Sequence, residues 1–388
     1  MNILFDYQAF EMQRFGGVSN SYAEIISHLK AMGVDARMAI KESNNEHLKQ
    51  IGIATSIKPL GTKHQCWFGS RKLFRGQRRI TRTILYPFGC KNDFLTINQD
   101  YCIRQIKKQK FDIFEPTFFD SYFLPFLNGK PFVLTVHDMI PELFPQYFAR
   151  DDFQIVNKKK LCPLATAIHV PSQKTKEDLV NILNINPHKI TVIPHGAPHN
   201  TVPPLEPQRL IDKPYILFVG ERGGYKNFIL LLQELAITTQ AIPELSLLCT
   251  GRPFNDGEQR LIAELRLTDN VHHIYADNEI FYSLYHNSIA FVYPSAYEGF
   301  GIPILEAFAY GCPVMLNNAS CFPEVGGDAA IYFDINRRGD LAEHLEAFLR
   351  SSEQDRTDLI TRGRERAKLF SWEDSARKLS HVYKTILA

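Results

Sequence analysis

Short apolar runs alternate with segments of helical spacing along most of this chain. Tyr22, Ile25 and Leu29 recur at intervals of three and four residues, which predicts a helix that Gly33 ends. Other runs, such as 215–219, are continuously apolar, as expected for parallel strands buried on both faces. The pattern predicts strands at 3–5, 131–136, 167–170, 189–193, 215–219, 245–249, 271–275, 290–293, 313–316 and 330–333. It predicts helices at 21–32, 172–183, 227–236, 280–287, 303–310 and 372–387. Strands that alternate with helices in this way predict an α/β fold with parallel sheets.

A break in this alternation divides the chain. Residues 197–214 lack the pattern and carry five prolines, which is typical of a linker. The 388 residues are also too many for one core. We therefore predict an N-terminal domain over 1–200 and a C-terminal domain over 208–371. The last helix, 372–388, can join the N-terminal domain.

Composition narrows the class of protein. The seven cysteines are odd in number and form no Cys-x-x-Cys pair, which argues against a disulfide framework and for a reducing compartment. No stretch approaches eighteen consecutive apolar residues, and a strand begins at Ile3 without a basic leader. We therefore expect a cytoplasmic protein without a signal peptide or membrane span.

One segment, 61–110, is strongly basic. It holds twelve Lys or Arg against two Asp, whereas the whole chain has a net charge of only +2. One interpretation is an ordinary solvated surface. The other is a docking patch for an anionic membrane surface, on the inner face of the membrane, where each basic residue contributes about 1 kcal/mol. Nucleic acid is disfavoured as a partner because no known binding module is recognisable.

The segment 293–306 carries the clearest chemical signal. Glu298 and Glu306 stand eight positions apart, on either side of a glycine turn that leads into a predicted helix. The amides of Phe300, Gly301 and Ile302 precede Pro303, and free amides at a helix start favour an anion. Glu306 is expected about 6 Å further along the helix axis. This layout suits a ligand with phosphates in the middle and hydroxyl-bearing rings on both sides, such as a nucleotide-activated sugar.

Further candidates lie at the carboxyl ends of other predicted strands, where open α/β sheets bind ligands. Arg222 and Lys226 follow the strand 215–219 in a glycine-containing loop and can bring positive charge to a diphosphate. His137 follows the strand 131–136; it is either a ligand-binding or a structural residue. The pair Gly16-Gly17 permits close approach of a phosphate or sugar, although it departs from the Gly-x-Gly-x-x-Gly fingerprint of dinucleotide binding.

We expect no metal in this site. The histidines lack metal-ligand spacing and no Asp-x-Asp occurs, so a Mg²⁺-bridged diphosphate is not indicated. The protein's own cations are then expected to neutralise the phosphates, and the nucleotide-sugar enters as a substrate rather than as a resident cofactor.

These residues resemble the retaining glycosyltransferases of family 4. The resemblance covers nearly the whole chain and rests on six motifs: Gly16-Gly17, His137-Asp138, Val170-Pro-Ser172, Ile193-Pro-His-Gly196, Lys226-Asn227 and Glu298-x7-Glu306. It implies the GT-B architecture, which is two Rossmann-like, doubly wound parallel-sheet domains facing a cleft. It also implies that the N-terminal half binds the acceptor and the C-terminal half the donor.

The resemblance assigns roles to the candidates. Glu306 would hold the ribose hydroxyls, and Glu298 would bind the donor sugar near its reacting carbon. The amides of Phe300 and Gly301, with Lys226 and Gly17, would hold the diphosphate, and His137 would touch the donor sugar. The chain departs from the family at Glu221, where an arginine is usual. Arg222 is the expected replacement.

The sequence thus predicts a retaining, metal-independent hexosyltransferase. It would move a hexose, with mannose as a candidate, from a UDP- or GDP-sugar to an acceptor hydroxyl in polysaccharide, lipopolysaccharide or glycolipid synthesis. Two alternatives stay open: another GT-B enzyme such as a nucleotide-sugar epimerase, and a non-catalytic nucleotide-sugar binding protein. The donor base, the sugar, the acceptor, the linkage and the oligomeric state are not encoded in these motifs.

Overall fold

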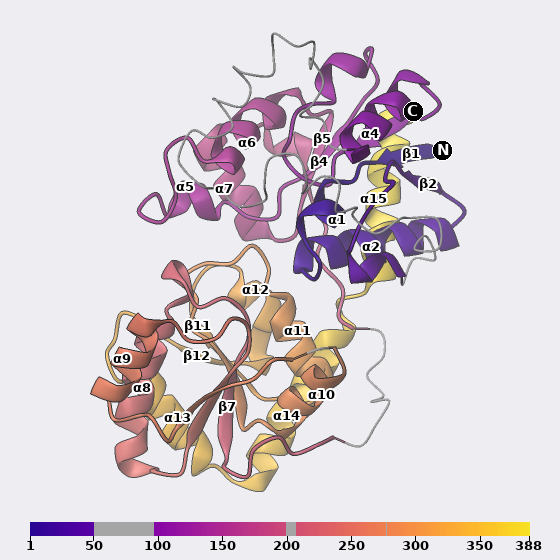
Figure 1. Cartoon of the computed structure of the whole chain (residues 1–388). Coiled ribbons are helices and arrows are strands. Elements are labelled where there is room, and N and C mark those ends of the chain that lie inside the picture. The colour runs from indigo at the N-terminus through magenta and orange to yellow at the C-terminus, as the bar shows by residue number, and fades with distance from the viewer. Residues whose placement is uncertain (50–96, 199–206, 277) are drawn as a thin grey trace. The chain divides into compact units, whose positions relative to one another are not determined.

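A computed structural model describes residues 1–49, 97–198, 207–276 and 278–388 (Figure 1). The chain forms two compact units. Unit 1 comprises Met1–Thr135, Val156–His169 and Ala376–Ala388, and unit 2 comprises Val136–Ile155 and Val170–Ser375. This division into units does not test the predicted domain limits, 1–200 and 208–371, which stay a prediction. Most of the basic segment, 61–96, lies outside the described residues. In its described part, Arg104 pairs with Asp100 at 2.6 Å and the Lys107 ammonium lies over Phe126.

Unit 1 contains a parallel sheet of order β2-β1-β3, in which Ile3 of β1 faces Ala36 of β2 and Ile113 of β3. Its elements, some of which cross a unit limit, are β1 (Asn2–Phe5), α1 (Gln8–Met12), α2 (Gly17–Ala31), β2 (Asp35–Met38), η1 (Glu46–Lys49), α4 (Ile97–Lys107), β3 (Ile113–Glu115), η5 (Leu124–Phe126), β4 (Val133–Thr135), α6 (Phe153–Leu164), β5 (Ala167–Val170) and α15 (Trp372–Leu387). A second parallel sheet has the order β4-β5-β6.

Unit 2 is built on a six-stranded parallel sheet of order β12-β11-β10-β7-β8-β9. Its elements are α5 (Ile140–Leu143), α7 (Gln173–Leu183), η6 (Pro187–Lys189), β6 (Ile190–Val192), β7 (Tyr215–Phe218), η7 (Gly224–Lys226), α8 (Phe228–Ala241), β8 (Ser246–Cys249), α9 (Asp256–Glu264), β9 (Val271–His273), α10 (Asn278–Asn287), β10 (Ala290–Tyr293), α11 (Ile302–Ala309), β11 (Val314–Asn317), α12 (Phe322–Gly326), η8 (Gly327–Ala329), β12 (Ile331–Phe333), α13 (Asp340–Leu349) and α14 (Glu353–Lys368).

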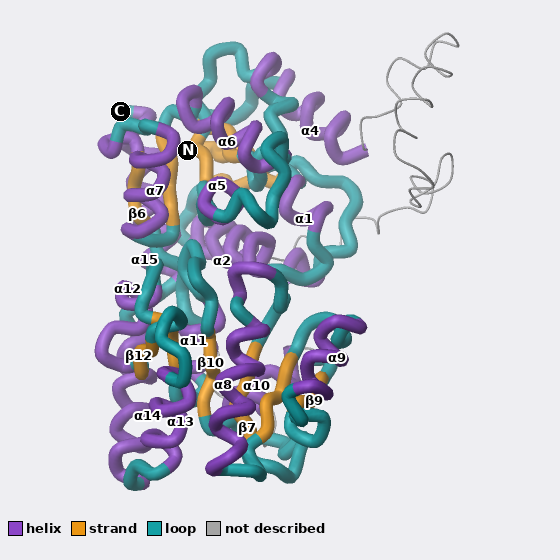
Figure 2. Tube along the Cα trace, turned by 90° about the vertical axis from the view of Figure 1, so that its left-hand side faces the viewer, coloured by secondary structure: helices purple, strands orange, loops and turns teal. Residues whose placement is uncertain are grey.

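Helices cover both faces of the six-stranded sheet (Figure 2). On β7, Leu217 packs in one core with residues of α10 and α11, whereas Ile216 and Phe218 pack in another core with residues of α8 and α13. Successive side chains of a strand point to opposite faces, so one strand feeds both cores. This double burial explains why the strands are continuously apolar, and it confirms the predicted α/β class with parallel sheets.

The strand order positions the site. The chain runs from β7 to β8 and β9 in one direction, then returns to β10 beside β7 and continues to β11 and β12. The order therefore reverses between β7 and β10, and ligands of open α/β sheets bind at such a switch point. The loops that leave the carboxyl ends of β7 and β10 carry Lys226 and Glu298.

Some elements differ from the sequence prediction. Helix α2 begins at Gly17 rather than at residue 21, with Gly16 as its N-cap residue. The additional elements are the short strands β2 and β3 and the helices α1, α4, α5, α6, α9, α12, α13 and α14. Within the described residues, no helix combines the length and the apolar composition needed to cross a membrane.

Candidate active site

Lys226 and Glu298 meet at the switch point. The ammonium of Lys226 forms an ion pair with the Glu298 carboxylate, and it lies 3.4 Å from the hydroxyl of Tyr293. Two hydrogen bonds fix the loops to each other: Ala296 N–H donates to Tyr225 O at 2.8 Å, and the side-chain amide of Asn227 donates to Pro294 O at 3.0 Å. The predicted neighbours are therefore held together by the backbone that carries them.

This ion pair is largely shielded from water. The side chain of Lys226 is 17% exposed and that of Glu298 is 10% exposed. Burial, together with the Glu298 charge, raises the pKa of Tyr293 well above its ordinary value, so its hydroxyl stays protonated. A shielded cation of this kind interacts more strongly with an anionic ligand than a solvated one does.

The start of α11 offers free backbone donors. Gly301 is the N-cap residue and has a φ of +95°, a left-handed conformation that favours glycine. The N–H groups of Phe300, Gly301 and Ile302 donate to no residue in the described part of the chain. The amides are thus available, as predicted from Pro303, although the helix begins one residue earlier, at Ile302. Such a helix start is suited to an anion.

The loop before α11 is held by side chains from the segment after β11. The hydroxyl of Ser320 accepts from Glu298 N–H at 3.2 Å and donates to Glu298 O at 2.8 Å. The thiol of Cys321 contacts the carbonyl oxygens of Glu298 and Phe300 at 3.2 and 3.1 Å. These contacts fix the backbone on both sides of Gly299.

Glu306 lies in α11, in the turn after the free amides. The hydroxyl of the buried Tyr285 donates to one Glu306 carboxylate oxygen at 3.0 Å. Burial raises the pKa of Glu306 above its ordinary value, and the hydrogen bond from Tyr285 opposes this rise. The second carboxylate oxygen has no hydrogen bond to a described residue, so it can accept from a ligand hydroxyl.

His137 reaches the same loop through its backbone. A Cβ on Gly299 would lie 1.8 Å from the carbonyl oxygen of His137, so the two segments touch and only glycine fits. The His137 ring stacks on His195 at 6.0 Å between centroids, and His195 also contacts Phe300 at 5.1 Å. His195 is thus buried among aromatic rings, as befits a structural residue.

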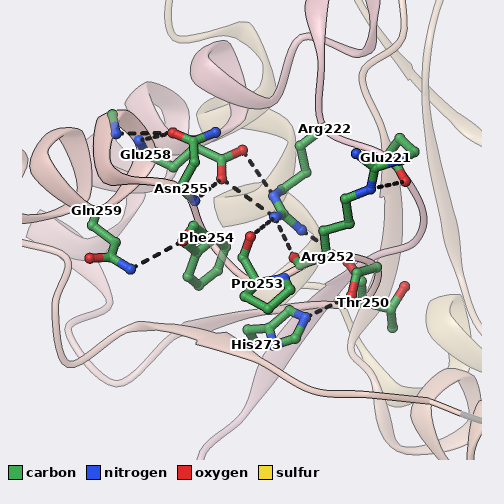
Figure 3. A network of polar contacts seen from close by, with 12 residues as sticks. Glu221, Arg222, Thr250, Arg252, Pro253, Phe254, Asn255, Glu258, Gln259 and His273 are labelled. Atoms are coloured by element: carbon green, nitrogen blue, oxygen red, sulfur yellow. Dashed lines mark hydrogen bonds and ion pairs between the residues drawn. The ribbon is translucent and has the colours of Figure 1, made fainter. Parts of the chain in front are cut away.

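Arg222 is not part of this cluster (Figure 3). Its guanidinium donates to Glu258 at 3.0 Å and to the backbone oxygens of Thr250, Arg252 and Pro253. It also lies over the rings of Phe228 and Phe254. The side chain is only 5% exposed. This geometry supports a structural role rather than the predicted contact with phosphate.

The position where the resemblance expects an arginine is also occupied differently. Glu221 pairs with Arg252 at 3.1 Å, and both side chains are mostly exposed.

Gly16 and Gly17 belong to unit 1, where a Cβ on Gly16 would collide with the side chain of Gln13. The residues that the structure describes contain no group of three His, Cys, Asp or Glu side chains suited to a metal.

Comparison with known proteins first defines the class of fold. The structure aligns with that of HepE from Anabaena in complex with UDP and glucose with a TM-score of 0.70, covering 99% of both chains at 16% identity. This likeness shows the α/β GT-B fold. Two family models then match in sequence: residues 15–200 match Glycosyltransferase Family 4, and residues 203–366 match Glycosyl transferases group 1. The chain belongs to the family 4 glycosyltransferases.

Two curated relatives are similar over much of the sequence. The O-antigen chain mannosyltransferase B of Escherichia coli is 29% identical over 69% of this chain and 73% of its own length. The O-antigen chain mannosyltransferase RfbU of Salmonella typhimurium is 28% identical over 54% of this chain and 58% of its own length.

Several residues of the site are absent from the sequence prediction. Tyr285 and Tyr293 looked like ordinary apolar positions of a helix and a strand, and both are indeed buried. Their hydroxyl groups nevertheless reach Glu306 and Lys226. Ser320 could have been found from the sequence, because it follows the apolar run 313–316 and therefore lies at the same edge of the sheet as Glu298.

Proposed function

We propose that this protein transfers mannose, or a closely related hexose, from a UDP- or GDP-sugar to an acceptor hydroxyl, with retention at the anomeric carbon. The observation that carries the proposal is the ion pair of Lys226 and Glu298, which stands two residues before the free amides at the start of α11. Both similar curated relatives are named as O-antigen mannosyltransferases, which supports mannose and a growing polysaccharide as acceptor.

The site supplies what departure of a nucleoside diphosphate requires. Negative charge develops on the phosphate oxygens as the bond to the sugar breaks, and pre-oriented donors stabilise that charge. Lys226 provides a cation and Phe300, Gly301 and Ile302 provide backbone donors. These groups are the basis for proposing that the enzyme needs no metal. On donor binding, the ammonium of Lys226 exchanges part of its contact with Glu298 for the phosphate.

Each carboxylate has a separate task. Glu306 accepts from the ribose hydroxyls through the oxygen that Tyr285 leaves available. Glu298 accepts from a sugar hydroxyl near the reacting carbon. The acceptor oxygen attacks from the side that the diphosphate leaves, the diphosphate takes the acceptor proton, and the new bond keeps the original anomeric configuration. His137, whose backbone touches Gly299, contacts the donor sugar.

The test combines binding with product analysis. We would screen UDP- and GDP-sugars by thermal shift, because a ligand at 100 times its Kd adds about 2.7 kcal/mol of apparent stability. The donor found in this way would be incubated with an O-antigen-type oligosaccharide acceptor, with and without a chelator, and the product linkage assigned by NMR. The proposal predicts a retained anomer and chelator-resistant activity. Formation of an isomer from the donor alone, or no turnover with any donor, would contradict it.

A further inference from the structure

One helix, α7, contacts the Glu298 loop on the C-terminal side of Glu298. The hydroxyls of Ser172 and Thr175 both donate to the carbonyl oxygen of Gly299, at 2.7 and 3.2 Å. Ser172 is at the same time the N-cap residue of α7, because its hydroxyl accepts from Thr175 N–H. Ser172 and Thr175 are fully buried, so water does not replace these bonds.

The same helix contacts the loop on the N-terminal side of Glu298. The hydroxyl of Tyr297 donates to an Asp178 carboxylate oxygen at 2.8 Å, and both residues are buried. A further bond joins the start of α7 to α12, where the amide of Gln173 donates to the Glu324 carboxylate at 2.9 Å. The residues directly before and after Glu298 are therefore both tied to α7.

These contacts set the direction of a backbone donor. In a planar trans peptide the C=O of one residue and the N–H of the next point in opposite directions. Ser172 and Thr175 draw the Gly299 carbonyl toward α7, so the N–H of Phe300 points away from it. Cys321 contacts the carbonyl of Phe300 in the same manner and orients the N–H of Gly301. The free amides at the start of α11 are thus aimed by bonds to the carbonyls of the same peptide groups.

We propose that Ser172, Thr175 and Asp178 of the α7 segment are positioning residues of the nucleoside-diphosphate site, which aim the Phe300 amide and hold Glu298 beside Lys226. This inference rests on the proposed function. A merely structural contact would affect only folding, whereas a positioning contact also changes the ligand affinity of the folded protein.

The experiment measures binding of UDP and GDP to the full chain by titration calorimetry. The main variant is Thr175→Val combined with Tyr297→Phe, which removes two hydroxyls and preserves side-chain volume. The variant removes one of the two hydroxyl donors to the Gly299 carbonyl and the bond from Tyr297 to Asp178. The Phe300 amide is then less firmly aimed, and nucleotide binding is expected to weaken about tenfold. The donor kcat/KM should fall by at least the same factor. Thr175→Ser, which keeps the hydroxyl, should bind like the wild type.

Matched controls separate positioning from capping. Ser172→Ala and Ser352→Ala each remove an N-cap hydroxyl, and Ser352 caps α14 through an exposed capping box. Both should lower the melting temperature, but only Ser172→Ala should weaken nucleotide binding. Asp178→Asn keeps an acceptor for Tyr297 and should retain more affinity than Asp178→Ala.

The outcomes distinguish the two levels of the argument. If the wild type binds neither UDP nor GDP, the proposed function is wrong. If the wild type binds one of them and the Thr175→Val, Tyr297→Phe double variant binds it equally well, the proposed function stands and the role of α7 is refuted. Equal loss of affinity in Ser172→Ala and Ser352→Ala would likewise refute it.

Discussion

Lys226 and Arg222 are cations of one loop, four residues apart, with opposite surroundings. Lys226 has one carboxylate and one more distant hydroxyl as polar partners, and its ammonium also lies over the rings of Tyr225 and Tyr293. Arg222 is bonded to a carboxylate and three backbone oxygens, and its guanidinium lies over the rings of Phe228 and Phe254. The comparison teaches that a cation available to a ligand is recognised by how few of its N–H donors are already bonded to the protein. Its place in a motif is a weaker guide.

The largest effect is expected on the free energy of unfolding when Arg222 is replaced. Arg222→Ala removes the guanidinium donors from the Glu258 carboxylate and from three carbonyls. Breaking a buried charged network of this kind costs about 3–5 kcal/mol. Urea unfolding should show this loss. Arg222→Lys should recover little, because an ammonium lacks the planar fork that the site uses. Near-wild-type stability of Arg222→Ala would undermine the comparison.

Lys226→Ala should show the reverse pattern. Loss of one donor to a developing anion typically lowers kcat by about 10²–10³-fold. We expect this fall in steady-state kinetics with the preferred donor, with a smaller change in urea midpoint than for Arg222→Ala. If Lys226→Ala keeps the wild-type kcat, Lys226 does not act on the leaving group.

Glu306 should give a pH-dependent contrast. Its pKa is raised in the folded state by burial, so the stability linked to its protonation is present at low pH and is lost as pH rises through the folded pKa. Glu306→Gln should therefore be more stable than the wild type at neutral pH, and this difference should shrink below the ordinary Glu pKa.

Acid should weaken binding of the nucleotide-sugar donor, although protonation of Glu306 favours folding. Ribose hydroxyls need an ionised acceptor, so the wild-type donor KM should rise as pH falls through the raised pKa of Glu306. In Tyr285→Phe, which loses the hydrogen bond that opposes the shift, the rise should begin at higher pH. A donor KM profile in Glu306→Gln identical to that of the wild type would contradict the assignment.

The smallest effect is expected at Glu221. Its pair with Arg252 is exposed, and such pairs contribute about 0–1 kcal/mol. Glu221→Ala should change neither unfolding free energy nor kcat beyond that range. A large loss of activity would show that the departure from the family arginine at this position has a catalytic meaning.

The sequence predicted the parts of the site that local pattern encodes. The apolar run 290–293, the glycines at 299 and 301 and the spacing of Glu298 and Glu306 define a loop that leads into a helix, and α11 confirms this. Long-range partners are different. Tyr297 and Asp178 are 119 residues apart, and Ser172 and Gly299 are 127 apart, so no local pattern links them.

Fold elements were missed where local pattern is weak. Strand β2 carries Asp35 and Arg37 with exposed side chains, and β3 ends in the fully buried Glu115, so neither forms a continuous apolar run. The role of Arg222 depends on Phe254 and Glu258, which tertiary packing places around it. The position of Arg222 in the glycine-containing loop, taken alone, favoured a contact with phosphate.

The central claim is that a nucleoside diphosphate sits on the amides at the start of α11 beside Lys226. Amide chemical shifts of Phe300, Gly301 and Ile302, followed by ¹⁵N NMR during titration with UDP or GDP, test it most directly. The account predicts that these three amides shift upon binding in the wild type and shift much less in Lys226→Ala. Saturable nucleotide binding that leaves all three amides unchanged would contradict it.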